Sequence, residues 1–317
     1  MTEILLHLLY AVLGIAGLYY GAEFLVKGGV SIARRAGVSP LVIGLTLVAF
    51  ATSAPELVVS VSAAIDGSSD ISLGNVVGSN ICNIALILGL CACITPMVVQ
   101  RQILRFDAHF MVGSAVLLAV FYLSGNGVNR IQALVLLAGM IVYVVWNVYA
   151  SRKENAAAET EKTEEKLLPL WQSLLLIVLA LALLVAGAKI FLRSAVFFAG
   201  KLGLSEAVIG LTIVAVGTSL PELATSVVAA IKGEDDIAIG NVVGSNIFNI
   251  LCILGITPLI APLKNAALDP VDMGAMILVS ILLVPMMRTG WKISRKEGAA
   301  LLILYAGYIT YLLCTHT

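Results

Sequence analysis

Charged side chains are scarce in this chain. Asp, Glu, Lys and Arg make up 12% of its 317 residues, about half of the roughly 25% that a soluble globular protein carries. Hydrophobic residues make up 60%. So little charge cannot cover a water-exposed surface, so the composition excludes an ordinary soluble protein and predicts a polytopic membrane protein.

Histidine and cysteine are also few, with three and five residues. The cysteines fall in apolar stretches, which is typical of small hydrophobic side chains in membrane helices and not of a disulfide framework. For Cys91 and Cys93, a metal or redox pair is the less favoured alternative. Outside the apolar runs there is no nucleophile–base pair and no His/Cys ligand cluster. We therefore expect a protein that is not an enzyme and has no cofactor.

Ten apolar runs are long enough, at about 18 to 25 residues, to cross roughly 30 Å of hydrocarbon as helices. They lie near residues 4–26, 40–65, 72–95, 108–124, 129–150, 168–192, 206–231, 238–261, 270–287 and 298–314. The first has neither a basic segment before it nor a small-residue cleavage site, so we interpret it as a retained span and not as a signal peptide. The predicted fold class is an all-α membrane protein with ten transmembrane helices.

One extended charged stretch divides the chain. Residues 151–166 are predicted to be a solvated linker between two halves, 1–150 and 167–317, with five helices each. Loops after the odd-numbered helices hold 14 Lys and Arg residues, and loops on the other side hold 4. The basic side of a membrane protein faces the cytoplasm. The linker is therefore predicted to be cytoplasmic, and both termini are predicted to lie outside.

Two blocks of sequence occur twice, 166 residues apart. Residues 44–56 read GLTLVAFATSAPE and residues 210–222 read GLTIVAVGTSLPE, identical at 9 of 13 positions. Residues 74–84 read GNVVGSNICNI, and residues 240–250 differ from them at one position. We place the two repeats at 38–90 and 204–256. Five crossings separate the copies, so they run in opposite directions, which predicts a 5+5 inverted-topology repeat.

Each repeat contains a glutamate directly after a proline, Glu56 after Pro55 and Glu222 after Pro221. A carboxylate at the centre of a bilayer costs at least about 2.5 kcal/mol, so two matched carboxylates indicate a function. The proline frees a helix carbonyl that a bound cation can satisfy. We therefore predict that the two glutamates meet near the midplane as half-sites for a cation.

Hydroxyl and amide side chains recur every four residues on these helices. They are Thr52, Ser60, Asn75, Ser79 and Asn83 in the first half, and Thr218, Ser226, Asn241, Ser245 and Asn249 in the second. Any one of them could instead form a hydrogen bond that joins two helices, worth about 0.6 to 2 kcal/mol, and the sequence alone does not decide between the two roles. Together with the glutamates they form an all-oxygen set, which favours Ca²⁺ and Na⁺ over zinc or copper.

These motifs resemble the two α-repeats of the cation/Ca²⁺ exchanger superfamily, and most closely those of prokaryotic sodium/calcium exchangers. The resemblance rests on ATSAPEL (51–57), GTSLPEL (217–223) and the two GNVVGSN blocks. It implies 5+5 inverted topology, alternating access, and electrogenic exchange of Na⁺ for Ca²⁺. It also implies an integral protein of the prokaryotic inner membrane.

The resemblance also assigns roles to individual residues. Glu56 and Glu222 match central Ca²⁺ ligands, assisted by the carbonyls of Thr52 and Thr218. The rest of the implied ion-binding set comprises Ser53 and Ser219, which adjoin these threonines, Ser79, Ser245, Ala49 and Ala215, which match flanking Na⁺ sites, and Asn83 and Asn249, which match a midplane pair. Some relatives, including potassium-coupled ones, have Asp where this chain has Asn249, so we expect exchange that does not need K⁺.

Two other functions remain open at this point. In a Ca²⁺/H⁺ antiporter the same glutamates would bind protons in place of Na⁺. A cation channel would need no counter-ion, but it usually builds its pore by oligomer symmetry, and the internal repeat disfavours it. The partners expected are Ca²⁺, Na⁺ and the lipid bilayer, with no nucleic acid and with the monomer as the functional unit.

Overall fold

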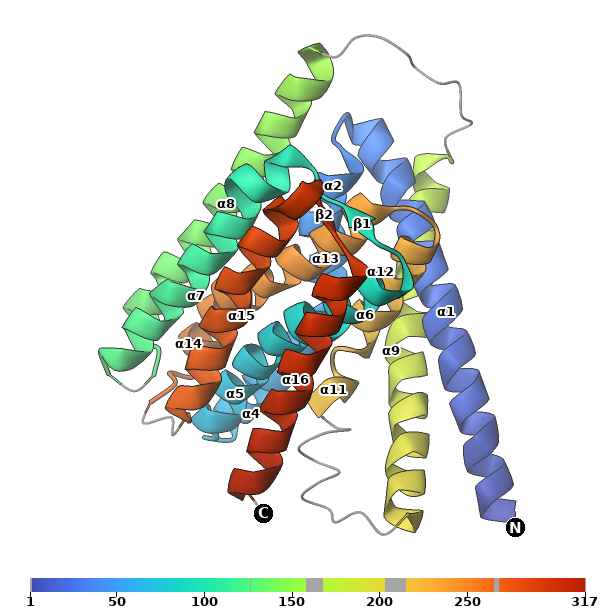
Figure 1. Ribbon diagram of the computed structural model, residues 1–317, viewed down its shortest axis with the longest axis vertical. Coiled ribbons are helices and arrows are strands. Elements are labelled where there is room, and N and C mark those ends of the chain that lie inside the picture. Colours follow the sequence, from blue (N-terminus) through green and yellow to red (C-terminus); the bar gives the residue numbers. More distant parts are fainter. Residues whose placement is uncertain (1, 126, 158–167, 203–214, 265–267, 317) are drawn as a thin grey trace.

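The computed structural model describes residues 2–125, 127–157, 168–202, 215–264 and 268–316, which are almost entirely helical (Figure 1). Within these ranges, eight helices are long and apolar enough to span a membrane. They are Glu3–Ala36, Ser69–Ile94, Ile103–Leu123, Arg130–Lys153, Leu170–Lys201, Asp235–Ile260, Pro270–Trp291 and Arg295–Thr315. The chain therefore folds as an all-α membrane protein.

Two predicted spans differ from simple helices. The span predicted at 40–65 is a pair of helices, Pro40–Thr52 and Ala54–Ile65, bent by 45° at the break between them. The span predicted at 206–231 lies partly outside the described residues, and its described part contains α11 (Ala215–Gly217) and α12 (Leu220–Ile231). The other eight predicted spans each correspond to a long apolar helix.

The remaining elements follow the chain in order. They are α1 (Thr2–Ala36), α2 (Pro40–Ile43), η1 (Gly44–Val48), α3 (Ala49–Thr52), α4 (Ala54–Ile65), α5 (Ser69–Ile81), η2 (Cys82–Leu88), α6 (Gly89–Ile94), β1 (Met97–Val98), η3 (Ile103–Asp107), α7 (Ala108–Leu123), α8 (Arg130–Ala157), α9 (Leu170–Lys201), α13 (Asp235–Phe248), η5 (Asn249–Ile253), α14 (Leu254–Ile260), α15 (Pro270–Arg288), η6 (Thr289–Trp291), β2 (Lys292–Ile293) and α16 (Arg295–His316). The segments η1, η2, η3 and η5 are π-helical turns. The predicted linker begins within α8, and its residues 158–166 lie outside the described part of the chain.

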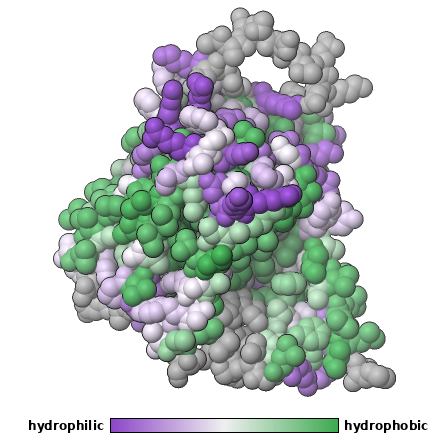
Figure 2. All heavy atoms as spheres, in the orientation of Figure 1, coloured by the Kyte–Doolittle hydropathy of each residue, from purple (hydrophilic) through white to green (hydrophobic). Residues whose placement is uncertain are grey.

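Both termini lie at the same end of the molecule (Figure 1). Hydrophilic side chains gather at the opposite end, and apolar ones cover the middle (Figure 2). Near the N-terminus, Leu5, Leu6, Leu8, Leu9 and Val12 of α1 are all exposed. An apolar surface of this extent is suited to a bilayer.

The two longest helices, α1 and α9, pack against each other (Figure 1). Glycines allow the close approach: a Cβ atom added at Gly17 would lie 3.1 Å from the Cα of Gly187. Backbones that approach through small residues are a common mode of helix packing in membranes. This pair lies beside the core of the protein and contacts it through α12.

The core consists of the helices that carry the duplicated motifs. An 18-residue stretch of the helix formed by α13, η5 and α14 is completely buried, and η1 and α3 pack against this helix. Gly244 provides the contact, because a Cβ atom there would lie 2.6 Å from the carbonyl oxygen of Leu45. The two halves of the sequence are thus packed together at the repeated segments.

Several contacts recur with the two halves exchanged. The strand β1 pairs antiparallel with β2, with Met97 opposite Ile293, and a second antiparallel bridge joins Val128 to Leu263. Met97 and Leu263 are related by the repeat offset of 166 residues, and Val128 and Ile293 are related by an offset of 165. A similar recurrence joins neighbouring helices within each half: Tyr143 donates a hydrogen bond to Asp107 and Tyr308 donates one to Asp272, both at 2.9 Å.

Candidate cation site

A break in the helix positions each glutamate. Helix α3 ends at Thr52, Ser53 adopts φ −82° and ψ 5°, and α4 begins at Ala54. The second half repeats this geometry at Ser219, with φ −88° and ψ 9°. Proline cannot donate a hydrogen bond to the preceding turn, so it belongs in the first turn of a new helix. Glu56 and Glu222 therefore lie in the first turns of α4 and α12, where the helix dipole favours negative charge.

The two glutamates are held by reciprocal bonds between the halves. The Ser53 hydroxyl donates to Glu222 Oε1 at 2.9 Å, and the Ser219 hydroxyl donates to Glu56 Oε1 at 3.1 Å. All four side chains are 0% exposed. The structure thus brings together the two carboxylates that the sequence placed 166 residues apart.

Two asparagines support the glutamate backbones. Asn75 donates to the Glu56 carbonyl at 3.2 Å and to Ser60 at 2.9 Å. Asn241 donates to the Glu222 carbonyl at 3.4 Å and to Ser226 at 2.9 Å. The side-chain oxygen of Asn241 also accepts a hydrogen bond from Thr52 Oγ1 at 3.1 Å, a further contact between the halves. These bonds fix the backbone on which the carboxylates are carried.

Among the buried side-chain oxygens that have no hydrogen-bond partner within the described residues, four belong to the two glutamates and to the predicted asparagine pair. They are Glu56 Oε2, Glu222 Oε2, Asn83 Oδ1 and Asn249 Oδ1. All four are acceptors, and they form two matched pairs. Buried polar atoms are nearly always paired, so an unpaired set indicates a ligand. A cation can satisfy acceptors of this kind, and carboxylate and amide oxygens suit Ca²⁺ and Na⁺.

Asn83 and Asn249 lie at the π-helical turns. Asn83 belongs to η2, which packs against α12, and Asn249 begins η5, which packs against α4. Each amide is thus carried by a segment that contacts the glutamate helix of the other half. Such turns are frequent at functional sites, since the extra residue changes where side chains point.

The other predicted residues lie on the same segments. Ser79 and Ser245 are buried one turn before Asn83 and Asn249, and the hydroxyl of Ser245 has no partner among the described residues. Ala49 begins α3 and is fully buried, and Ala215 begins α11. The hydroxyl of Thr218 has no described partner either. The side chain of Thr218 lies beside the carboxyl group of Glu56.

Sequence reasoning missed two residues, Asn80 and Asn246. Asn83 Nδ2 donates to Asn246 Oδ1 at 3.1 Å, and Asn249 Nδ2 donates to Asn80 Oδ1 at 3.0 Å. The four amides form a buried cluster between the halves. Asn80 and Asn246 are offset by one residue from the four-residue stripe. Their identity in the two GNVVGSN blocks was the signal that could have found them.

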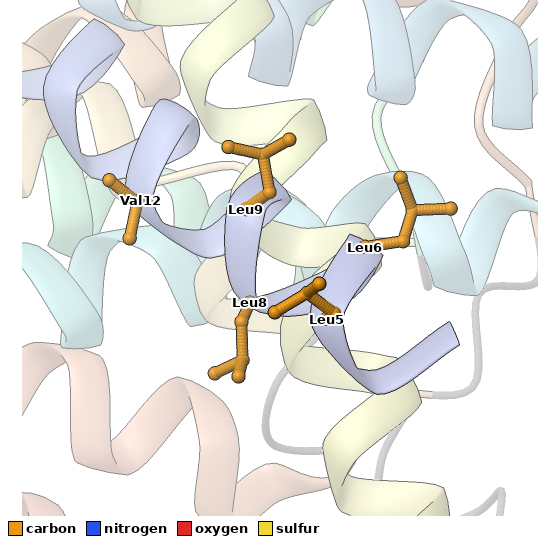
Figure 3. Close-up of a pocket in the computed structure, with 5 residues that line it drawn as sticks. All are labelled: Leu5, Leu6, Leu8, Leu9 and Val12. Atoms are coloured by element: carbon orange, nitrogen blue, oxygen red, sulfur yellow. The ribbon is translucent and has the colours of Figure 1, made fainter. Parts of the chain in front are cut away.

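The described residues offer few other places for a cation. No group of three or more His, Cys, Asp or Glu side chains gathers within them, so carboxylates alone cannot complete a site, and hydroxyl, amide or carbonyl oxygens must contribute. A hollow of about 570 Å³ on α1 is lined by Leu5, Leu6, Leu8, Leu9 and Val12 (Figure 3). Its lining suits hydrocarbon and not an ion.

Known proteins resemble this chain over nearly its whole length. The family described as sodium/calcium exchanger protein matches residues 6–149 and 172–314. The putative antiporter CaxA of Alkalimonas amylolytica is 38% identical, with 95% of this chain and 96% of that protein covered. The sodium/calcium exchanger MaX1 of Methanosarcina acetivorans is 36% identical, with 98% and 99% covered.

A solved structure shows the same likeness. The sodium–calcium exchanger NCX_Mj superposes with a TM-score of 0.83 at 35% identity, covering 98% of this chain and 99% of that one. These relatives are transporters, so the prediction that the chain is not an enzyme is confirmed. The resemblance read from the two α-repeats is confirmed as well: this chain belongs to the sodium/calcium exchanger family of membrane antiporters.

Proposed function

We propose that this protein exchanges Na⁺ for Ca²⁺ across the membrane at a site centred on Glu56 and Glu222. The observation that carries the proposal is the pair of buried carboxylates, each bonded to a serine of the other half and each with one oxygen left unpaired. One Ca²⁺ neutralises two carboxylates. The exchanger names of the relatives MaX1 and NCX_Mj support the choice of ions.

Competition for the same oxygens couples the two fluxes. Either Ca²⁺ or a set of Na⁺ can balance the two charges, with Ser79, Ser245, Ala49 and Ala215 as the proposed flanking Na⁺ positions. An empty site would carry two uncompensated carboxylates across a medium of low dielectric constant, which is costly. The protein therefore crosses between its two states with cargo and exchanges ions instead of leaking them.

The proposed architecture is ten helices in a 5+5 inverted repeat. The two motif copies, the strand pairing of Met97 with Ile293 and the bridge of Val128 with Leu263 support it, because each contact recurs with the halves exchanged. Both termini at one end of the molecule (Figure 1) fit an even number of crossings. With 14 Lys and Arg residues on one side against 4 on the other, we place both termini outside the inner membrane.

Alternating access requires a movable element beside a fixed core. We assign this role to α1 and α9, which pack on each other through Gly17 and Gly187 and lack the duplicated motifs. With three Na⁺ for each Ca²⁺, a cycle would move one net charge, worth about 2.3 kcal/mol per 100 mV. We propose further that K⁺ is not cotransported, because Asn249 and Asn83 are neutral amides and add no charge to balance it.

Proton coupling is the second candidate, because buried carboxylates can take up protons as well as Na⁺. The test is uptake of ⁴⁵Ca²⁺ into proteoliposomes with pH clamped on both sides. Uptake that follows an outward Na⁺ gradient supports Na⁺/Ca²⁺ exchange. Uptake that needs a pH gradient and ignores Na⁺ would replace it with Ca²⁺/H⁺ exchange, and a steady conductance without counter-ion would indicate a channel.

A further inference from the structure

The side-chain amides of Asn83 and Asn249 have a fixed orientation. It is set by Asn80 and Asn246, two asparagines outside the predicted ion-binding set. The side-chain NH₂ of Asn80 donates to the backbone carbonyl of Asn246 at 3.3 Å and faces the sulfur of Met276 at 3.8 Å. Both partners can only accept. The amide of Asn80 therefore cannot be reversed without placing two acceptors against each other.

The orientation of the Asn80 amide determines the orientation of the Asn249 amide. Because the NH₂ group of Asn80 is already bonded, its Oδ1 is the atom that faces Asn249. The NH₂ group of Asn249 donates a hydrogen bond to this oxygen at 3.0 Å. The remaining atom of that amide, Asn249 Oδ1, then points away from Asn80 and has no donor among the described residues. One backbone carbonyl thus determines which atom of Asn249 is left for a ligand.

A similar relay runs in the other half, although within the described contacts its first amide donates to a sulfur atom and not to a backbone carbonyl. The NH₂ of Asn246 faces the sulfur of Met111 at 3.6 Å, and Asn246 Oδ1 accepts the NH₂ of Asn83 at 3.1 Å. Asn83 Oδ1 is likewise left without a described donor. Met111 and Met276 are both fully buried, on α7 and α15, so neither relay is open to water at that end.

Without this constraint, each amide would have a competing partner. The turn that carries Asn249 packs against α4, which carries Glu56, and the turn that carries Asn83 packs against α12, which carries Glu222. Each carboxylate has an unpaired oxygen. A free amide would turn its NH₂ toward such an oxygen, because hydrogen bonds to charged groups are the strong ones. That bond would occupy a Ca²⁺ ligand and direct two N–H groups at the cation.

We propose that Asn80 and Asn246 are positioning residues that hold the carbonyl oxygens of Asn249 and Asn83 toward the cation and keep their NH₂ groups away from the carboxylates. The inference rests on the proposed site at Glu56 and Glu222. Each half of the protein orients the amide ligand of the other half, so the cation site is complete only when the halves are packed together.

The experiment measures Ca²⁺ binding by the thermal stabilisation of purified full-length protein. In Asn80→Val and Asn246→Val the half-saturating Ca²⁺ concentration should rise about tenfold, a factor equal to about 1.4 kcal/mol and within the net worth of one hydrogen bond. The matched control is Asn147→Val, another buried asparagine, which bonds Tyr143 and Gln102 outside the site. It should lower the melting temperature and leave the Ca²⁺ dependence unchanged.

A double-mutant cycle separates positioning from packing. If Asn80 acts through Asn249, adding Asn80→Val to Asn249→Ala should change the half-saturating concentration by less than twofold. A full tenfold change in that background, or no change in the single variants, overturns the proposal. If wild-type protein binds Ca²⁺ but does not couple it to Na⁺, the proposed function fails while this test still stands.

If the variants do not fold, a measurement on the wild-type protein tests the proposal instead. In protein labelled with ¹³C and ¹⁵N at asparagine, Ca²⁺ should shift the side-chain carbonyl carbons of Asn83 and Asn249 and leave those of Asn80 and Asn246 nearly unchanged. The reverse pattern would mean that Asn80 and Asn246 are themselves the ligands, and it would refute their role as positioning residues.

Discussion

Replacing Glu222 by glutamine should abolish Ca²⁺ binding and transport while the protein still folds. The carbonyl of the new amide can keep the hydrogen bond from Ser53, now 2.9 Å long. Its NH₂ then replaces Oε2, the oxygen that has no described donor. The substitution therefore preserves shape and the contact between the halves, but it removes one negative charge and directs N–H groups toward the cation.

The size of the effect follows from Coulomb's law. A divalent cation about 3 Å from the carboxylate charge, at an effective dielectric constant of about 20, is attracted by roughly 11 kcal/mol. Desolvation of the carboxylate and the ion offsets much of this. If only a third remains, about 3.7 kcal/mol, the affinity falls about 500-fold. The same argument applies to Glu56→Gln, which keeps its bond from Ser219.

The assay is sodium-driven ⁴⁵Ca²⁺ uptake into proteoliposomes, together with Ca²⁺-dependent thermal stabilisation of the purified protein. Glu3→Gln, the same change at an exposed position near the N-terminus, is the matched control and should behave as wild type. Half or more of the wild-type uptake in a well-folded Glu222→Gln protein would refute the assignment of the central charge.

Other predictions follow from the packing and from the neutral amides. Gly244→Ala should lower the melting temperature by several degrees, because its Cβ would lie 2.6 Å from the Leu45 carbonyl oxygen; Gly113→Ala, which meets open space, should not, and equal melting temperatures would refute the close contact. Uptake should be the same with and without K⁺ at a clamped potential, and a strict K⁺ requirement would contradict our reading of the amides. Asn249→Asp should make transport more sensitive to pH through repulsion between like charges, and an unchanged pH profile would count against its place beside the glutamates. In a cysteine-free background, cysteines at Thr2 and at Ala156 should react with an impermeant reagent from opposite sides, and labelling from one side would overturn the topology.

The duplicated motifs could be read from the sequence because two independent constraints agree on them. A carboxylate in an apolar helix is costly enough to need a reason, and the second copy of the motif supplies the partner. Glu56 and Glu222 could therefore be paired before any coordinates. The sequence placed a single span over 40–65, and the 45° bend at Ser53, where α13 packs against α3, appears only in the structure.

Contacts between the halves were harder to predict. Glu23 lies four residues before Lys27, a spacing that suits an ion pair, yet Glu23 pairs with Lys232 of α12 at 2.8 Å. This partner lies 209 residues away along the chain, so spacing within one helix could not identify it. Asn80 and Asn246 were missed for a similar reason: their partners lie 169 and 163 residues away along the chain.

The lengths of the outer helices also differed from expectation. The first span was predicted at 4–26, but α1 continues to Ala36, past Lys27 and Arg34. Hydropathy marks where a helix leaves hydrocarbon, and it does not mark where the helix ends. Both basic side chains are exposed, so the helix can continue beyond the apolar belt.

The most direct test of the central claim is a sodium-gradient experiment on wild-type proteoliposomes. With pH clamped, potassium absent and the membrane potential held at zero, vesicles loaded with Na⁺ and diluted into Na⁺-free buffer should accumulate ⁴⁵Ca²⁺. Vesicles with equal Na⁺ on both sides, and vesicles carrying Glu222→Gln, should not. Accumulation that is indifferent to the Na⁺ gradient, or that persists in the Glu222→Gln protein, would contradict Na⁺/Ca²⁺ exchange through the paired glutamates.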